Sequence, residues 1–363
     1  MCQHIDEAEG GFDRRTLLVR GTAALAAAGA AGALPWPRAA GAAVNRDADV
    51  VLQTVGGPVP GSSIHWALGH EHFFVDFLGP SDPAYMDTDW SEVTRSCVAS
   101  AQVLRSQGVD LFIDWTNLGV GRNVLLLRDI SRQTGMKIVC ATGIYKSLVP
   151  PQFERSSVDE IATHFYEELA AGIDGTPVRA GWIKIATTES GPTRTDRRIH
   201  RAAARAGKKA AATISLHSPF TDATLAVVKT LEREGFDLRR FVWGHAQPSS
   251  VDDHKALAAR GAMVQYDAIG AQSDPFFHGP TDDASMLDRI QAMVEAGYGD
   301  RVVVSADASV FVNPAIYQYD RNNAYVFGTF AAKLRERLGD DAARMVLRDN
   351  VIYAFRRPSK LRS

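Results

Sequence analysis

Short apolar runs alternate with amphipathic stretches along most of this chain. Eight of the runs predict β-strands, and most of them are nearly continuous in apolar residues, as is typical of strands that are buried on both faces. The predicted strands are Ile64–Leu68, Leu111–Trp115, Lys137–Thr142, Trp182–Ala186, Thr213–His217, Arg240–His245, Ala262–Asp267 and Val302–Ser305.

Between these strands, apolar residues recur at helical spacing, and a glycine follows most of the stretches as a C-terminal stop signal. The predicted helices are Ser91–Gln107, Val124–Thr134, Ser157–Ala171, Asp196–Ala206, Asp222–Glu234, Asp252–Arg260, Asp283–Ala296 and a terminal helix at Tyr325–Arg337. Eight strand–helix units in series predict a parallel (β/α)8 TIM barrel of the α/β class. A doubly wound sheet is the structural alternative, but no glycine-rich phosphate loop follows the first strand to support it.

The N-terminal segment stands apart from this pattern. The pair Arg14-Arg15 is followed directly by Thr-Leu-Leu. An alanine-rich apolar run then extends from Gly21 to Leu34, and Ala40-Gly41-Ala42 has the form of a cleavage site. An arginine pair before such a run resembles a twin-arginine (Tat) export signal. We therefore predict a signal peptide at 1–43, recognised by the Tat export machinery, and a single catalytic barrel at 44–363 in the periplasm or outside the cell. An alanine-rich leader without an export function is the alternative.

The amino-acid composition and net charge restrict the kinds of molecule that the protein is expected to bind. The 363 residues are 45% hydrophobic and 23% charged, which is ordinary for a globular enzyme, and a formal net charge of −2 argues against a nucleic-acid partner. The run Gly21–Leu34 is too short for a membrane anchor. Cys97 and Cys140 fall in a predicted helix and a predicted strand, and we expect them to be buried thiols rather than a disulfide pair.

Residues that could hold a metal gather at the ends of the predicted strands. His70 and His72 follow the first strand and would project from the same side of its continuation. At or near the ends of other strands lie Lys184, His217, His245 and Asp307. A single histidine in a strand is usually a core residue, but the strand ends of a barrel meet at one face. Four histidines and an aspartate at that face suit zinc, or cobalt or manganese.

Lys184 is the unusual member of this set. An ammonium group repels a metal ion, and its burial in an apolar strand is costly. Either the amine has reacted with CO₂ to give an anionic carbamate that could bridge two metals, or it is a neutral or ion-paired buried lysine. The residues by themselves leave both possibilities open.

Several stretches of the chain together resemble the phosphotriesterase family of the amidohydrolase superfamily. They follow the order found in the family and cover about residues 50–357. The matching stretches are Leu68–His72, Gly108–Thr116, Gly121–Asn123, Ala141–Tyr145, Ala180–Thr188, Leu216–Ser218, Gly244–His245 and Ser305–Asp307.

The resemblance implies a binuclear centre for two divalent ions, Zn²⁺ first and Co²⁺ or Mn²⁺ as alternatives. The more buried ion would be held by His70, His72 and Asp307, and the more exposed ion by His217 and His245. N6-carboxylated Lys184 and a hydroxide would bridge the ions. The hydroxide would attack the substrate carbonyl or phosphoryl group while Asp307 accepts its proton. The resemblance also implies a homodimer.

Tyr145 bears on the choice of substrate. A tyrosine after Thr142-Gly143-Ile144 resembles the phosphotriesterase-like lactonases, in which it lines the pocket above the metals, whereas dedicated phosphotriesterases carry a tryptophan there. Tyr145 could instead pack under a loop. The lactonases also carry an arginine just past the aspartate that ends strand seven, and here Ala268 replaces it. Lys146 is a nearby cation that could also face solvent.

Three functions remain open on these residues. The first is an exported metal-dependent hydrolase of lactones or related esters, small-molecule substrates, with side activity on organophosphates. The second is a dedicated phosphotriesterase (aryldialkylphosphatase). The third is a catalytically inactive binding protein on the same barrel, which the presence of all six expected ligands opposes. The aromatic loop Ala308–Asp320 would shape the pocket, but it matches no subgroup.

Overall fold

The computed structural model describes residues 50–146, 148–271, 279–313 and 321–358. The predicted signal peptide with its boundary at 43/44 and the second half of the aromatic loop lie outside the described residues. All described residues belong to one compact unit, Gly41–Ser363.

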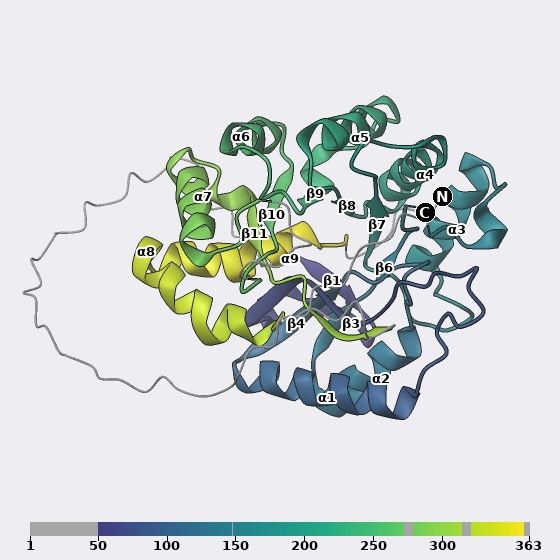
Figure 1. Cartoon of the computed structure of the whole chain (residues 1–363), viewed down its shortest axis with the longest axis horizontal. Helices are drawn as coiled ribbons and strands as arrows, with labels where there is room; N and C mark the ends of the chain where they lie inside the picture. Colours follow the sequence, from purple (N-terminus) through teal and green to yellow (C-terminus); the bar gives the residue numbers. More distant parts are fainter. Residues whose placement is uncertain (1–49, 147, 272–278, 314–320, 359–363) are drawn as a thin grey trace, which may run out of the picture. The chain divides into compact units, whose positions relative to one another are not determined.

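Parallel strands form the centre of this unit, and helices lie around them (Figure 1). An antiparallel hairpin, β1 with β2, precedes the parallel strands. The strands are β1 (Val51–Thr54), β2 (Gly57–Pro60), β3 (Trp66–Asp76), β4 (Val109–Asp114), β5 (Lys137–Val139), β6 (Ala141–Thr142), β7 (Trp182–Ala186), β8 (Ile214–His217), β9 (Phe241–Gly244), β10 (Met263–Tyr266), β11 (Val302–Val304) and β12 (Ser309–Asn313).

Two pairs of short strands are the halves of single barrel strands. Only Cys140 separates β5, which pairs with β4, from β6, which pairs with β7. In the same way β11 pairs with β10, and β12, four residues further on, pairs in parallel with β3. Within the described residues the hydrogen-bonded order therefore returns to β3 after eight strand positions. The predicted TIM barrel is confirmed.

The helices follow the strands in the predicted order. The α-helices are α1 (Trp90–Ser106), α2 (Val124–Thr134), α3 (Val158–Ala170), α4 (Arg194–Ala210), α5 (Thr221–Arg233), α6 (Val251–Ala259), α7 (Asp283–Glu295), α8 (Ala331–Arg344) and α9 (Asn350–Ala354). Shorter helical turns are η1 (Gly61–Ser63), η2 (Pro151–Phe153), η3 (Leu238–Arg240), η4 (Gly299–Arg301), η6 (Val326–Phe330) and η7 (Met345–Asp349). Among these residues no helix has the length and apolar character needed to cross a bilayer.

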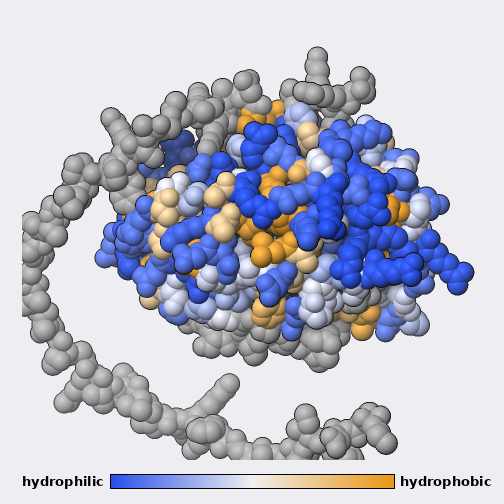
Figure 2. Space-filling view, turned by 90° about the horizontal axis from the view of Figure 1, so that it is seen from above, coloured by the Kyte–Doolittle hydropathy of each residue, from blue (hydrophilic) through white to orange (hydrophobic). Residues whose placement is uncertain are grey.

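The apolar core has two layers because side chains alternate along each strand. On β4, Leu111 and Ile113 belong to an inner cluster with Trp115, whereas Phe112 belongs to an outer cluster between the strands and the helices. Cys97 and Cys140 are free, buried thiols in the outer layer, as expected. On the face seen in Figure 2, hydrophilic side chains surround a small apolar area.

Two local predictions are wrong. The first barrel strand does not end at Leu68 but continues to Asp76, because its second half pairs with β12. The predicted helix Asp196–Ala206 does not stop at Gly207 but continues to Ala210. A Cβ atom on Gly207 would lie 3.0 Å from the ring of Phe236, so this glycine allows close packing inside a helix rather than ending it.

Candidate metal centre

A bulge in β3 turns His70 and His72 toward the barrel interior. Leu68 pairs with Phe112 and Glu71 pairs with Asp114, so β3 uses three residues where β4 uses two. Gly69 lies in this bulge, and a Cβ atom added to it would lie 2.7 Å from Cγ1 of Val303 in the inner cluster. The bulge therefore changes the alternation of the strand just before the two histidines.

The two histidines converge on Asp307. Nε2 of His70 lies 3.1 Å and Nε2 of His72 lies 3.2 Å from Oδ1 of Asp307, which follows β11. The ring of His70 stacks on Trp115 with the centroids 3.6 Å apart, and the Trp115 indole donates to the Gly69 carbonyl at 2.6 Å. The Trp115 ring thus fixes the orientation of the His70 ring.

A buried carboxylate, Asp267, orients two of the rings. Its oxygens accept hydrogen bonds from Nδ1 of His70 at 2.8 Å and from Nδ1 of His245 at 3.0 Å. Burial alone would raise the pKa of Asp267, but the rings of His245 and His70 hold it below its ordinary value. With Nδ1 donating to Asp267, the neutral form of each ring has its lone pair on Nε2.

Thr116 fixes the tautomer of His72 in the same way. Its hydroxyl donates to the carbonyl of Phe74 at 3.0 Å and therefore accepts from Nδ1 of His72 at 2.9 Å. Burial lowers the pKa of His72 to about 3, so the ring is neutral at pH 7. Its Nε2 faces Asp307 with a lone pair.

Lys184 enters the same cavity from β7. Its side chain is buried, with Nζ 5.0 Å from the centre of the Trp115 ring and 5.5 Å from that of Tyr145. Within the described part of the chain, Nζ makes no hydrogen bond or ion pair. Burial lowers the pKa of this amine to about 8. Lys184 is thus a buried amine that no described carboxylate contacts in an ion pair, an arrangement that is costly unless the amine is modified or neutral.

His217 and Tyr145 complete the cavity. The Tyr145 hydroxyl lies 3.2 Å from Nε2 of His217, and the His217 ring meets that of His245 with the centroids 4.3 Å apart. Burial, followed by the neighbouring His245, lowers the pKa of His217 well below its ordinary value. The cavity has a volume of about 70 Å³. Its lining includes His72, Tyr145, Lys184, His217, His245 and Asp307.

Two further sets of hydrogen bonds fix the side chain and the backbone of Asp307. Nη1 of Arg321 donates to its Oδ2 at 3.0 Å and to its carbonyl at 2.8 Å. Glu71 accepts hydrogen bonds from the amides of Ala306 and Ala308, which flank Asp307. Asp307 has a φ of 49° and His245 a φ of 61°, a strained region for residues with a side chain. These hydrogen bonds hold Asp307 in that conformation.

The structure brings together every residue that the sequence predicted for the site. They are His70, His72, Tyr145, Lys184, His217, His245 and Asp307. The sequence reasoning gave no role to Asp267, although it also ends a strand at this face. It likewise missed Arg321, which lies 14 residues beyond Asp307 and carries no local signal.

The donor set fits divalent metal ions. In a tetrahedral zinc site with bonds of roughly 2.0–2.1 Å, neighbouring ligand atoms lie roughly 3.3 Å apart. The separations of 3.1 and 3.2 Å from Asp307 Oδ1 to the two histidine nitrogens are close to this value. Buried Nε2 of His70 makes no hydrogen bond and faces a carboxylate oxygen, so two lone pairs oppose each other unless a cation lies beside them.

The chain is similar to proteins of one family along nearly all of its described length. It matches the phosphotriesterase family over residues 50–354. It is 31% identical to the phosphotriesterase homology protein of Escherichia coli (strain K12), over 75% of this chain and 90% of that protein. It is 30% identical to the aryldialkylphosphatase of Saccharolobus solfataricus, over 69% of this chain and 78% of that protein.

A solved structure supports the same similarity. It is described as molecular engineering of organophosphate hydrolysis activity from a weak promiscuous lactonase template. The two chains are 26% identical with a TM-score of 0.73, and the match covers 84% of this chain and 99% of that one.

Proposed function

The chain belongs to the phosphotriesterase family of metal-dependent hydrolases, and from this premise we propose that it hydrolyses lactones or related carboxylic esters, with side activity on organophosphates. The observation that carries the proposal is the convergence of the four histidines, Lys184 and Asp307 on one cavity, with Asp267 and Thr116 fixing three of the histidine tautomers. Neutral rings with lone pairs aimed at a common point are what a metal-dependent hydrolase requires.

We propose that two zinc ions occupy the centre. His70, His72 and Asp307 would hold one ion, and His217 and His245 the other. Lys184, which forms no ion pair with the described residues, would join them as an N6-carbamate. Carbamate formation joins the neutral amine to CO₂ and releases one proton, so an anionic carboxylate would take the place of an uncharged amine. When bound, the metals lower the pKa of water and polarise the substrate oxygen.

Residues of the chain itself would position the catalytic groups and transfer the proton of the attacking water. Asp307 would accept the proton of the attacking water on its carboxylate and pass it to the leaving group. Arg321 on Oδ2 keeps this carboxylate oriented, with Oδ1 facing the histidines. Asp267 would act through His70 and His245, as a positioning residue.

Tyr145 supports the preference for a lactone. Its hydroxyl lies in the wall of the cavity, 3.2 Å from His217, and not under a loop away from the site. A hydroxyl at that point can donate to the oxygen of an acyl group. The second candidate, a dedicated phosphotriesterase, draws support from the 30% identity to the aryldialkylphosphatase.

The test combines metal content with substrate choice. Protein purified with bicarbonate and zinc should contain about two metal ions per chain, and Lys184→Ala should lose at least one of them. The loaded parent should then open γ- and δ-lactones with a higher kcat/KM than it shows for paraoxon. Asp307→Asn with its metals retained should lose roughly 100- to 10,000-fold in kcat.

Each alternative has its own outcome. Preference for paraoxon over all lactones would replace the first proposal with a phosphotriesterase. A metal-replete protein that is inert on lactones, esters and phosphotriesters would favour a binding protein. No bound metal in the parent after reconstitution with zinc or cobalt would overturn the hydrolase mechanism.

A further inference from the structure

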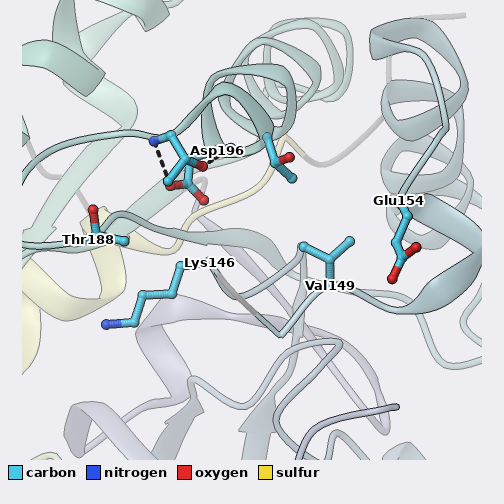
Figure 3. A pocket seen from close by; sticks show the side chains of 7 residues that line it. Lys146, Val149, Glu154, Thr188 and Asp196 are labelled. Carbon is cyan, nitrogen blue, oxygen red and sulfur yellow. Dashed lines mark hydrogen bonds between the residues drawn. The ribbon is translucent and has the colours of Figure 1, made fainter. Parts of the chain in front are cut away.

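A second cavity lies beside the metal centre. It has a volume of about 290 Å³, against about 70 Å³ for the cavity at the histidines. Residues that follow β6 and β7, together with the start of α4, line it, and Figure 3 labels Lys146, Val149, Glu154, Thr188 and Asp196 among them. No metal ligand proposed above takes part in its lining.

Neighbouring residues of the chain, Tyr145 and Lys146, line the two cavities. Tyr145 lines the smaller cavity and Lys146 the larger one. The Tyr145 ring centre lies 5.5 Å from Nζ of Lys184 and 5.4 Å from Nζ of Lys146. Lys146 directly follows Tyr145, so its side chain begins at the wall of the smaller cavity. The larger cavity therefore offers space, next to Tyr145, for the part of a substrate that extends beyond the bond being cleaved.

Lys146 has no counter-ion within the described part of the chain. Its side chain is half-buried, and its ammonium makes no hydrogen bond or ion pair there, only the contact with the face of Tyr145. A half-buried cation has lost part of its hydration without gaining a partner. The amine therefore has an unused capacity to bind an anion.

The carboxylates near Lys146 act on it through their field and form no ion pair with it within the described residues. Asp196 accepts from the amide of Thr193 at 2.9 Å in the capping box at the start of α4, and it is almost fully buried. Glu154 lies at the opposite end of the cavity from Lys146, with Val149 between them (Figure 3). Glu189 is exposed and acts on Lys146 only through its field.

We propose that Lys146 binds a carboxylate carried by the substrate, so that the enzyme prefers acyl compounds with an anionic group remote from the scissile ester. This inference rests on the proposed hydrolase function and specifies its substrate class. The ammonium would pair with the carboxylate, while the linking chain lies against Val149. Lys146 is then a specificity-determining residue and takes no part in bond cleavage.

The experiment compares matched substrates on the zinc-loaded protein. One member is a γ-lactone with a side chain that ends in a carboxylate, and the other ends in the uncharged carboxamide. The parent should favour the carboxylate in kcat/KM by roughly 10- to 100-fold at the best linker length. Lys146→Met should abolish this preference and leave the carboxamide rate within about 3-fold, because the variant keeps the length of the side chain. Lys146→Arg should retain most of the preference.

The outcomes separate this inference from the proposed function. A parent that opens both lactones equally, with Lys146→Met changing both alike, would overturn the carboxylate site and leave the hydrolase proposal intact. If the parent opens neither lactone, calorimetry with glutarate tests the site without turnover. Binding to the parent that is about 10-fold tighter than to Lys146→Met would support the site, and equal binding would overturn it.

Discussion

At the scale of single residues, Asp267 shows how one carboxylate prepares a metal site. Its carboxylate accepts hydrogen bonds from Nδ1 of His70 and from Nδ1 of His245, and it also accepts one from the backbone amide of His245 at 3.0 Å. Two rings from different strands therefore share one orienting group. Partners of this kind raise the affinity of a site because the ligands are already in place when the metal arrives.

The first prediction at this scale is that Asp267→Asn weakens metal binding by roughly 10- to 100-fold, because an amide cannot accept from both imidazoles with the strength of a carboxylate. Competition with a chelator measures the affinity. The matched control is Asp76→Asn, another buried carboxylate, which accepts from the amides of Leu78 and Met86. Equal metal affinity in the parent and a folded Asp267→Asn variant would contradict the role.

At the scale of elements, a buried ion pair joins the loop before α2 to α3. Nη1 and Nη2 of Arg122 each donate to an oxygen of Glu168 at 2.6 Å, and both side chains are almost fully buried. Arg122 also donates to the carbonyl of Ala141 on β6. The pair therefore fixes the helix and the loop to the strand that leads to Tyr145.

Because of this ion pair, we expect the folded protein to lose stability in acid. Burial alone would raise the pKa of Glu168, but Arg122 holds it below the ordinary value of 4.5. The contribution to the free energy of unfolding is complete above that value and is lost as the pH falls through the lowered pKa of the folded state. At pH 7 Glu168→Gln should cost about 3–5 kcal/mol, and the difference from the parent should shrink below about pH 4.5. Urea unfolding across this pH range measures both.

An exposed ion pair provides the comparison for that measurement. Arg132 and Asp129 lie on the surface of α2, 2.6 Å apart. Asp129→Asn should cost about 0–1 kcal/mol at pH 7, since solvent already screens the pair. A Glu168→Gln variant as stable as Asp129→Asn at pH 7 would show that the buried pair is not the constraint described here.

At the scale of the whole molecule, we propose that the precursor is exported by the twin-arginine route, and a homodimer remains a prediction. The route carries folded proteins, which suits an enzyme that acquires its metals before export. Replacing Arg14 and Arg15 by lysines should retain the precursor in the cytoplasm, because that route reads the arginine pair. Cell fractionation followed by blotting measures this. Unchanged export of the double variant would reject the twin-arginine assignment.

The order of the barrel and most of the site could be read from the sequence, because those features depend on local patterns. Strands buried on both faces must be continuous apolar runs, and ligands of a barrel site must follow them. For this reason the positions of His70, Lys184, His217 and Asp307 follow from the order of residues along the chain. The thiols and most helix ends follow from the same local rules.

The remaining features were decided by tertiary contacts between distant parts of the chain. The bulge at Gly69 depends on how β3 registers with β4, and the hydrogen bonds of Asp267 and Arg321 join segments far apart in sequence. Whether Lys146 forms an ion pair with the described carboxylates of its cavity likewise depends on where the fold places them. A local pattern shows that a residue can donate, accept or carry charge, but only the packed chain determines which partner it meets.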